Sequence, residues 1–337
     1  MSDRAWTILE LLKESTAFLE KRGIESPRVN AEVLLGHTLG VRRVDLYARF
    51  DAPVGEAPLS AFRELVRRRL ARVPLQYLTG SVEFYSRAFA IREGVFIPRP
   101  ETELLVERAL DAVGGAPPRV QFGVREAAGP VEGNGSDGVG DATRASETAK
   151  PAVAPAPAPL APLRFAEIGV GSGAILASLL LARPQATAVG TDLSDAALTL
   201  AAENARAHGV DDRVEFRAGS LFEPFAASDE ASFDLVLANP PYLSDDVLPA
   251  LAPEVRDHEP RAALTAADGG LAALRALVAG AWTWLRPRGV LALEIGDTQG
   301  AQVGELLAAS ARYDDITLTQ DYAAKDRVYL ARRKDDR

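Results

Sequence analysis

Residues 163–194, LRFAEIGVGSGAILASLLLARPQATAVGTDLS, hold the pattern that decides the fold. A short apolar run at 163–169 predicts a buried strand, and the apolar stretch at 172–184 predicts a helix of similar burial. A second strand is expected at 186–192, directly after this helix. Strand, glycine-rich turn, helix and strand in immediate succession are typical of a parallel βαβ unit.

The same alternation continues to the end of the chain and predicts an α/β fold with a mostly parallel sheet covered on both faces. The expected helices are 194–209, 269–287 and 301–313, and the further expected strands are 213–219, 233–242, 289–296, 315–322 and 326–334. No helix separates the last two strands. They must pair through a short turn, so that one of them runs antiparallel.

The rest of the chain divides by composition. Residues 1–75 show helical periodicity only and predict a small helical domain, followed by a hairpin linker at 76–98 and the α/β domain at 99–337. Within that domain, 114–160 is about half Gly, Ala and Pro. A segment of this composition cannot bury enough apolar area to offset its ordering entropy, so we expect a disordered insertion.

Composition restricts the class of protein. The chain has 337 residues, no cysteine and a net charge of −9. Disulfides and thiolate metal sites are excluded, and no signal peptide or membrane span is predicted, so we expect a cytoplasmic protein. Residues 1–75 carry 13 Lys and Arg against 10 Asp and Glu. This mildly basic region beside an acidic remainder indicates different partners or a chance difference in surface charge.

The glycine-rich turn at Gly169, Gly171 and Gly173 lets a ligand approach the backbone closely. Its spacing lacks the third glycine of a dinucleotide fingerprint, and no lysine follows as in a P-loop. A tight turn without a ligand remains the alternative. Asp192 follows the next strand and suits the two hydroxyls of a ribose, although it could also cap the following helix.

The strand at 233–238 ends in a second distinctive turn, Asn239-Pro240-Pro241-Tyr242. The Asn239 side chain can accept and donate hydrogen bonds, and the carbonyl of Pro240 is free to accept one because prolines lack the N–H needed for a ladder. Tyr242 offers a flat ring. Together these groups predict a clamp for a planar –NH₂ group, against the alternative of a rigid turn that only leaves the sheet.

These motifs resemble those of class I S-adenosylmethionine-dependent methyltransferases acting on amino groups, and more specifically the HemK/PrmC family. The matching strings are PLQYLTG (74–80), FIPRPETELLVERAL (96–110), EIGVGSGAI (167–175), NPPY (239–242), EPRAAL (259–264), LEIGDTQ (293–299) and DRV (326–328). The resemblance implies a seven-stranded sheet with antiparallel last strands and an N-terminal all-helical domain that contacts the protein substrate.

It also implies an activity: transfer of a methyl group from S-adenosylmethionine to the side-chain amide nitrogen of glutamine in the Gly-Gly-Gln motif of peptide chain release factors. S-adenosylhomocysteine would be the other product. An amino-methyltransferase acting on a DNA base is the alternative, because an Asn-Pro-Pro-Tyr turn also suits a flipped base. The acidic catalytic region weighs against it.

Site residues follow from the same resemblance. The expected catalytic residues are Asn239, Pro240 and Tyr242, and Pro241 joins them in binding the substrate. The expected cofactor-binding residues are Glu167, Gly169, Val170, Gly171, Ser172, Gly173, Asp192, Leu221 and Asn239. We expect a monomer that needs no metal, with release factors as partners and neither nucleic acid nor membrane.

Overall fold

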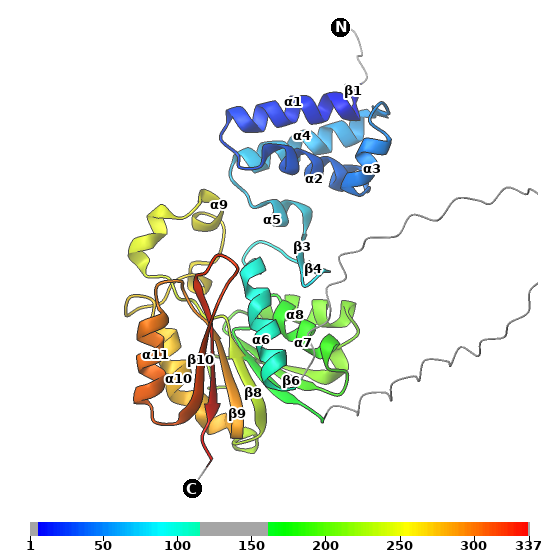
Figure 1. Ribbon diagram of the computed structural model, residues 1–337. Helices are drawn as coiled ribbons and strands as arrows, with labels where there is room; N and C mark the ends of the chain where they lie inside the picture. Colours follow the sequence, from blue (N-terminus) through cyan, green and yellow to red (C-terminus); the bar gives the residue numbers. More distant parts are fainter. Residues whose placement is uncertain (1–5, 115–160, 336–337) are drawn as a thin grey trace, which may run out of the picture.

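The computed structural model describes residues 6–114 and 161–335 (Figure 1). The insertion expected at 114–160 lies outside these ranges except for Gly114. None of the helices in the described ranges combines the length and the apolar character needed to cross a membrane.

A helical bundle forms the N-terminal part. Its helices are α1 (Ile8–Lys21), α2 (Pro27–Leu39), α3 (Arg43–Ala48) and α4 (Glu56–Leu70). Thr7 caps α1 by accepting the backbone N–H of Glu10, and the Glu10 carboxylate accepts the N–H of Thr7 in return. Fully buried leucines from α1, α2 and α3 fill the core, among them Leu19, Leu34 and Leu46.

The expectation of helices only in residues 1–75 is wrong in one detail. Strands β1 (Trp6–Thr7) and β2 (Pro53–Val54) pair antiparallel beside the bundle. The extended backbone of the cap residue Thr7 gives β1 its conformation, and the loop before α4 lies alongside it. Two-residue strands carry no detectable alternation of polar and apolar residues, which is why periodicity missed them.

The linker also begins differently from the expectation. The sequence favoured a hairpin from residue 76, but helix α5 (Leu75–Thr79) forms there instead. It begins after Pro74, and Gly80 ends it with a positive φ of 70°. The hairpin itself follows as β3 (Ser81–Phe84) and β4 (Arg87–Ala90). It connects the bundle to the α/β domain.

The α/β domain contains the expected seven-stranded sheet, in the order β10-β11-β9-β8-β5-β6-β7. Its strands are β5 (Arg164–Ile168), β6 (Thr187–Asp192), β7 (Val214–Ala218), β8 (Phe233–Ala238), β9 (Leu285–Glu294), β10 (Tyr313–Gln320) and β11 (Asp326–Arg333). β11 runs antiparallel to both of its neighbours, β9 and β10, and the pairs from β9 to β7 are parallel.

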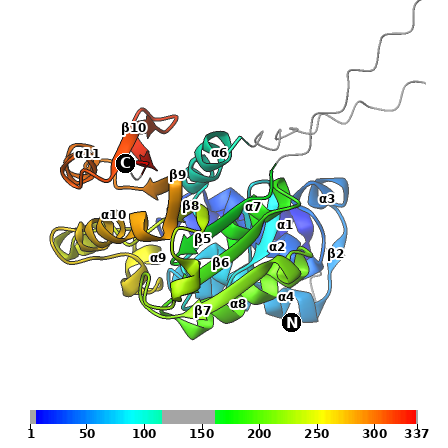
Figure 2. The same ribbon diagram turned by 90° about the horizontal axis from the view of Figure 1, so that it is seen from below.

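Helices cover both faces of this sheet (Figures 1 and 2). One face carries α6 (Glu103–Ala112), α7 (Ala174–Ala182) and α8 (Asp195–Ala207), and the other carries α10 (Ala272–Trp284) and α11 (Gly300–Ala309). Alternate residues of β8 divide between the two cores: Leu235 and Leu237 face α6 and α7, whereas Val236 faces α10. This period of two, with apolar residues throughout, is what a sheet buried on both faces requires.

Shorter elements complete the described chain. They are α9 (Pro253–Arg256) and the 3₁₀ helices η1 (Pro100–Thr102), η2 (Asp211–Arg213), η3 (Ala227–Asp229), η4 (Asp245–Ala250) and η5 (Arg261–Ala263). Strand order reverses at β5, which has β6 on one side and β8 on the other. In sheets of this kind the crevice at the carboxyl ends of such strands is where ligands bind.

Candidate active site

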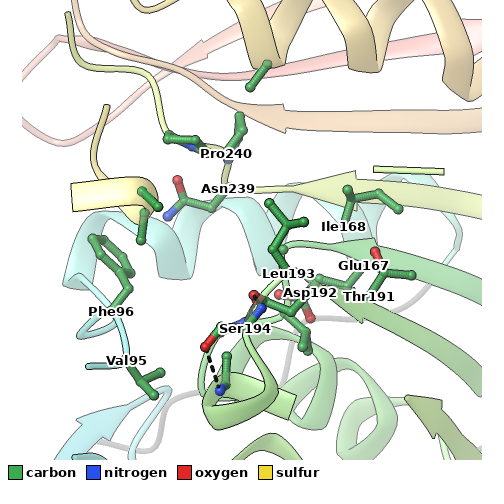
Figure 3. Close-up of a pocket in the computed structure, with 18 of the residues that line it drawn as sticks. Val95, Phe96, Glu167, Ile168, Thr191, Asp192, Leu193, Ser194, Asn239 and Pro240 are labelled. Carbon is green, nitrogen blue, oxygen red and sulfur yellow. Dashed lines mark hydrogen bonds between the residues drawn. The ribbon is translucent and has the colours of Figure 1, made fainter. Parts of the chain in front are cut away.

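A cavity of about 600 Å³ lies at the carboxyl ends of β5, β6 and β8 (Figure 3). Its lining brings together most of the residues singled out in the sequence: Glu167, Gly169, Val170, Gly171, Ser172, Asp192, Leu221, Asn239, Pro240 and Pro241. Gly173 and Tyr242, two further expected site residues, are not part of this lining. The volume is in the range of pockets that enclose a small organic ligand.

The glycine-rich turn has two distinct tasks. Gly169, Gly171 and Gly173 all have positive φ, at 77°, 53° and 78°. A Cβ atom at Gly169 or Gly171 would meet no atom within 4 Å, so the space beside the turn is open to a ligand. A Cβ at Gly173 would instead lie 3.1 Å from the Cα of Ala201, because α8 packs closely there. Gly173 therefore serves helix packing.

Asp192 links this turn to the end of β6. Its Oδ2 accepts the backbone N–H of Gly171 and its Oδ1 accepts that of Ser194, both at 2.9 Å. Each carboxylate oxygen keeps a further lone pair that can accept a hydrogen bond from a ligand hydroxyl. Ser194, not Asp192, supplies the side-chain cap of α8. Capping of α8 therefore does not account for the presence of Asp192 at this position.

Glu167 is the buried acid of the cavity. It is 1% exposed, and its Oε2 has no hydrogen-bond partner among the described residues. Burial, with a smaller effect from the negative charge of Asp192, raises the pKa of Glu167 well above its usual value, and a backbone hydrogen bond from Leu176 opposes the rise. A buried carboxyl oxygen without a partner, next to an open glycine turn, is suited to a positively charged ligand group.

The Asn-Pro-Pro-Tyr turn reaches the cavity through its first three residues. The Asn239 side chain donates from Nδ2 to the hydroxyl oxygen of Thr102 at 3.1 Å, and Figure 3 shows it on the far side of the cavity from Asp192. Its other amide atom, Oδ1, is left to accept a hydrogen bond from a bound molecule.

Tyr242 packs on the core between the sheet and α10. Its backbone carbonyl accepts the amide N–H of Gln299 at 2.9 Å, and its hydroxyl lies 3.5 Å from Oε1 of Glu294. Burial raises the pKa of this hydroxyl. The aromatic side chain that lines the cavity is Phe96, on which the Arg99 guanidinium lies 4.8 Å from the ring centroid.

Several lining residues escaped the sequence analysis, including Phe96, Thr102, Leu193 and Pro260. Leu193 is 73% exposed directly after Asp192, which places an apolar side chain at the rim. The strings 96–110 and 259–264, which carried part of the resemblance, were the available signal for the other three. Composition and periodicity alone assign them no role.

One wall of the cavity contains Pro260 and belongs to the chain segment that follows the Asn-Pro-Pro-Tyr turn. Contacts from elsewhere in the chain hold this wall in place. The Glu259 carboxylate, 1% exposed, pairs with Arg99 and accepts the backbone N–H of Ile97. Glu254 in α9 pairs with Arg69 of the helical bundle. Linker and bundle therefore position the wall that contains Pro260.

Comparison with known proteins agrees with this arrangement. Residues 10–80 match the family model of the PrmC N-terminal domain, and residues 162–324 match that of a methyltransferase domain. The chain is therefore a methyltransferase. Its fold is also similar to that of the hMettl16 catalytic domain in complex with the MAT2A 3′UTR hairpin 6, with a TM-score of 0.51 at 14% identity, over 81% of this chain and 83% of that one.

Sequence relatives extend over nearly the whole chain. The chain is 34% identical to the release factor glutamine methyltransferase of Nitratidesulfovibrio vulgaris, over 97% of this chain and 95% of the relative. It is 36% identical to the protein of the same name from Moorella thermoacetica, over 98% of this chain and 100% of the relative. The chain belongs to the release factor glutamine methyltransferase family.

Proposed function

We propose that this protein transfers a methyl group from S-adenosylmethionine to the side-chain amide nitrogen of the glutamine in the Gly-Gly-Gln motif of peptide chain release factors. Family membership and the names of the relatives support this substrate. The observation that carries the proposal is that the Asn239 amide, anchored through Nδ2, faces the same cavity as the glycine turn and Asp192.

The part of the cavity that the glycine turn and Asp192 line is suited to bind S-adenosylmethionine. The open space at Gly169 and Gly171 would admit its amino acid portion, and Glu167 would pair with the positive charge there. Asp192 would accept hydrogen bonds from the ribose hydroxyls, with Leu221 and Leu193 beside the adenine. Val170 and Ser172 complete the expected contacts. When bound, the cofactor supplies a methyl group on a positively charged sulfur and leaves as S-adenosylhomocysteine.

The part of the cavity that Asn239, Pro240 and Pro241 line would hold the glutamine amide. Oδ1 of Asn239 and the carbonyl oxygen of Pro240 would accept its two N–H hydrogens, so that the nitrogen faces the methyl group. Pro241 adds apolar surface. The geometry supports a flat aromatic contact at Phe96 more directly than at Tyr242, since Phe96 lines the cavity.

This geometry addresses the main difficulty of the reaction. An amide nitrogen is a poor nucleophile because its lone pair is delocalised into the carbonyl. The enzyme would align the nitrogen with the methyl carbon and exclude water, which can lower the barrier by several kcal/mol. A C–N bond would form as the bond between sulfur and the methyl carbon breaks, with its electron pair left on sulfur, and the nitrogen would then release one proton to the solvent.

We further propose that the protein acts as a monomer in the cytoplasm, on the release factor itself and without contact to nucleic acid. Methylation of a DNA base is not favoured, since the full-length relatives carry the release factor name.

The test is mass spectrometry of release factor peptides after incubation with the full chain and S-adenosylmethionine. We expect the mass of one methyl group on the peptide that contains the Gly-Gly-Gln motif, with duplex DNA left unmodified in a parallel reaction. The Asn239→Ala variant should lose at least about 100-fold in rate while it still binds the cofactor. An unmodified glutamine with wild-type enzyme, or near-full methylation by Asn239→Ala, would contradict the proposal.

A further inference from the structure

Glu259 is a buried carboxylate that joins two sides of the cavity. It directly precedes Pro260 in the wall described above, and its side chain is 1% exposed. Its Oε2 accepts the backbone N–H of Ile97 at 3.2 Å, and its Oε1 pairs with the guanidinium of Arg99. Both partners belong to the chain that follows the hairpin, at least 160 positions earlier in the sequence. Glu259 therefore fixes the wall relative to the linker.

The linker reaches the cavity through Phe96 and Pro98, the two residues that flank Ile97. Ile97 itself is 2% exposed and packs in the core. Its backbone is restricted to extended conformations because a proline follows, and its N–H is bonded to Glu259. The peptide group between Phe96 and Ile97 is thereby held in one orientation.

Arg99 extends this control to the side chain of Phe96. The central carbon of its guanidinium lies 4.8 Å from the ring centroid, which is within cation–π distance, and covers one face of the ring. The same guanidinium pairs with Glu259. Figure 3 shows the ring directed towards the side of the cavity where Asn239 lies. The carboxylate thus holds the guanidinium, and the guanidinium holds the ring.

Stability alone gives no reason for this arrangement. A carboxylate as deeply buried as Glu259 loses its hydration on folding, and the attraction to its partner does little more than offset that cost. Apolar residues of similar volume would fill the same space without it. They could not supply a fixed guanidinium over the Phe96 ring, nor an acceptor for the Ile97 N–H.

We propose that Glu259 and Arg99 are positioning residues for methyl transfer, which hold the Phe96 ring in place as an aromatic wall for the substrate amide. This inference rests on the proposed function, because it places the glutamine amide against Phe96. A ring free to change rotamer would let the amide turn, and its nitrogen would face the methyl group for less of the time. Neither Arg99 nor Glu259 lines the cavity, so both act through Phe96 and the wall.

The decisive experiment measures Arg99→Met in two backgrounds. Methionine keeps much of the length of the side chain and removes the guanidinium. In the otherwise wild-type chain, kcat/KM for release factor methylation should fall about 10-fold, since the ring loses its support. In the Phe96→Leu background the same change should alter kcat/KM by less than about twofold, because no ring is left to hold. Cofactor affinity, measured by calorimetry, should stay at the wild-type value throughout.

Glu259→Gln tests the carboxylate separately. The new side-chain oxygen can still accept the N–H of Ile97, but the charge that holds Arg99 is gone. We expect kcat/KM to fall about 10-fold with unchanged cofactor affinity. The double variant Arg99→Met/Glu259→Gln should lose no more than the larger single loss, because the two residues act as one unit. It leaves neither charge of the pair behind, so it decides the matter if a single variant fails to fold.

Arg92→Met is the matched control. Arg92 lies in the same linker and pairs with Glu203 of α8, but both side chains are exposed and neither lines the cavity. This variant should keep wild-type kcat/KM. Wild-type kcat/KM in Arg99→Met, or an equal loss with and without the Phe96 ring, would overturn the inference. A wild-type enzyme that left the glutamine unmodified would contradict the proposed function itself.

Discussion

Arg69 of the helical bundle pairs with Glu254 of α9, with 2.8 Å between Nη2 and Oε1, across 185 positions of sequence. The Arg69 side chain is 7% exposed and also donates to Oδ1 of Asn30 at 2.7 Å. Arg72 approaches the same Glu254 oxygen at 3.3 Å. The bundle therefore holds the chain segment that follows the Asn-Pro-Pro-Tyr turn.

Loss of this ion pair should weaken both the fold and substrate binding. Arg69→Met removes the closer of the two arginines from the Glu254 carboxylate and takes away the hydrogen bond to Oδ1 of Asn30. Urea unfolding should show a loss of about 1–3 kcal/mol. The KM for the release factor should rise, because the wall is no longer held in place. Arg67→Met, which removes an exposed pair with Glu64, is the matched control and should change stability by less than about 0.5 kcal/mol. Equal losses in the two variants would contradict this interpretation.

Asp192 should control cofactor affinity. Replacement by Asn removes the negative charge and one of the two acceptor oxygens, so S-adenosylmethionine should bind at least about 10-fold more weakly by calorimetry. Asp195→Asn, three residues later in the first turn of α8 and outside the cavity lining, should bind it normally. Unchanged affinity in Asp192→Asn would remove Asp192 from the proposed cofactor site.

Phe96 and Tyr242 should respond differently to loss of the ring. Phe96→Leu removes the aromatic surface from the cavity, and we expect kcat/KM for the release factor to fall about 10-fold with little change in stability. Tyr242→Leu should mainly destabilise the protein, by about 1–3 kcal/mol, since that ring packs on the core. The reverse outcome, with the larger catalytic loss at Tyr242, would restore the stacking role to that residue.

The buried Glu294 predicts that the stability of the protein depends on pH. Burial is the main cause that raises its pKa, from a usual value of 4.5 to about 7. The folded protein therefore binds a proton more tightly than the unfolded chain does. Below the unfolded pKa the folded state bears no penalty. The penalty develops as pH rises towards 7 and is complete above it, at roughly 3 kcal/mol.

Comparison with Glu294→Gln isolates this contribution, because Glu167 and the other acids are present in both proteins. The variant should gain stability over wild type as pH rises from about 5 to about 8 in urea titrations. A stability difference that does not depend on pH would show that Glu294 is not the titrating group.

Much of the fold could be predicted because it is encoded locally. The run of buried residues at 233–238, the glycines at 169–173 and the prolines at 240 and 241 each restrict the backbone over a few residues. Their order along the chain restricts the topology in turn, since parallel strands need helical crossovers. The two-residue strands near Trp6 and the helix at 75–79 were missed because so few residues carry no periodic signal.

By itself, the sequence determined which functional groups the site contains and at which edge of the sheet they lie, because the glycine turn, Asp192 and the Asn239 turn all follow strands. Only the tertiary structure decided which side chains meet. Thr102 contacts Asn239 across 137 positions, and the partly buried Tyr242 packs against the core while Phe96 lines the cavity. The physical reason is that local sequence restricts backbone torsions, whereas the partner of a side chain depends on how distant elements pack.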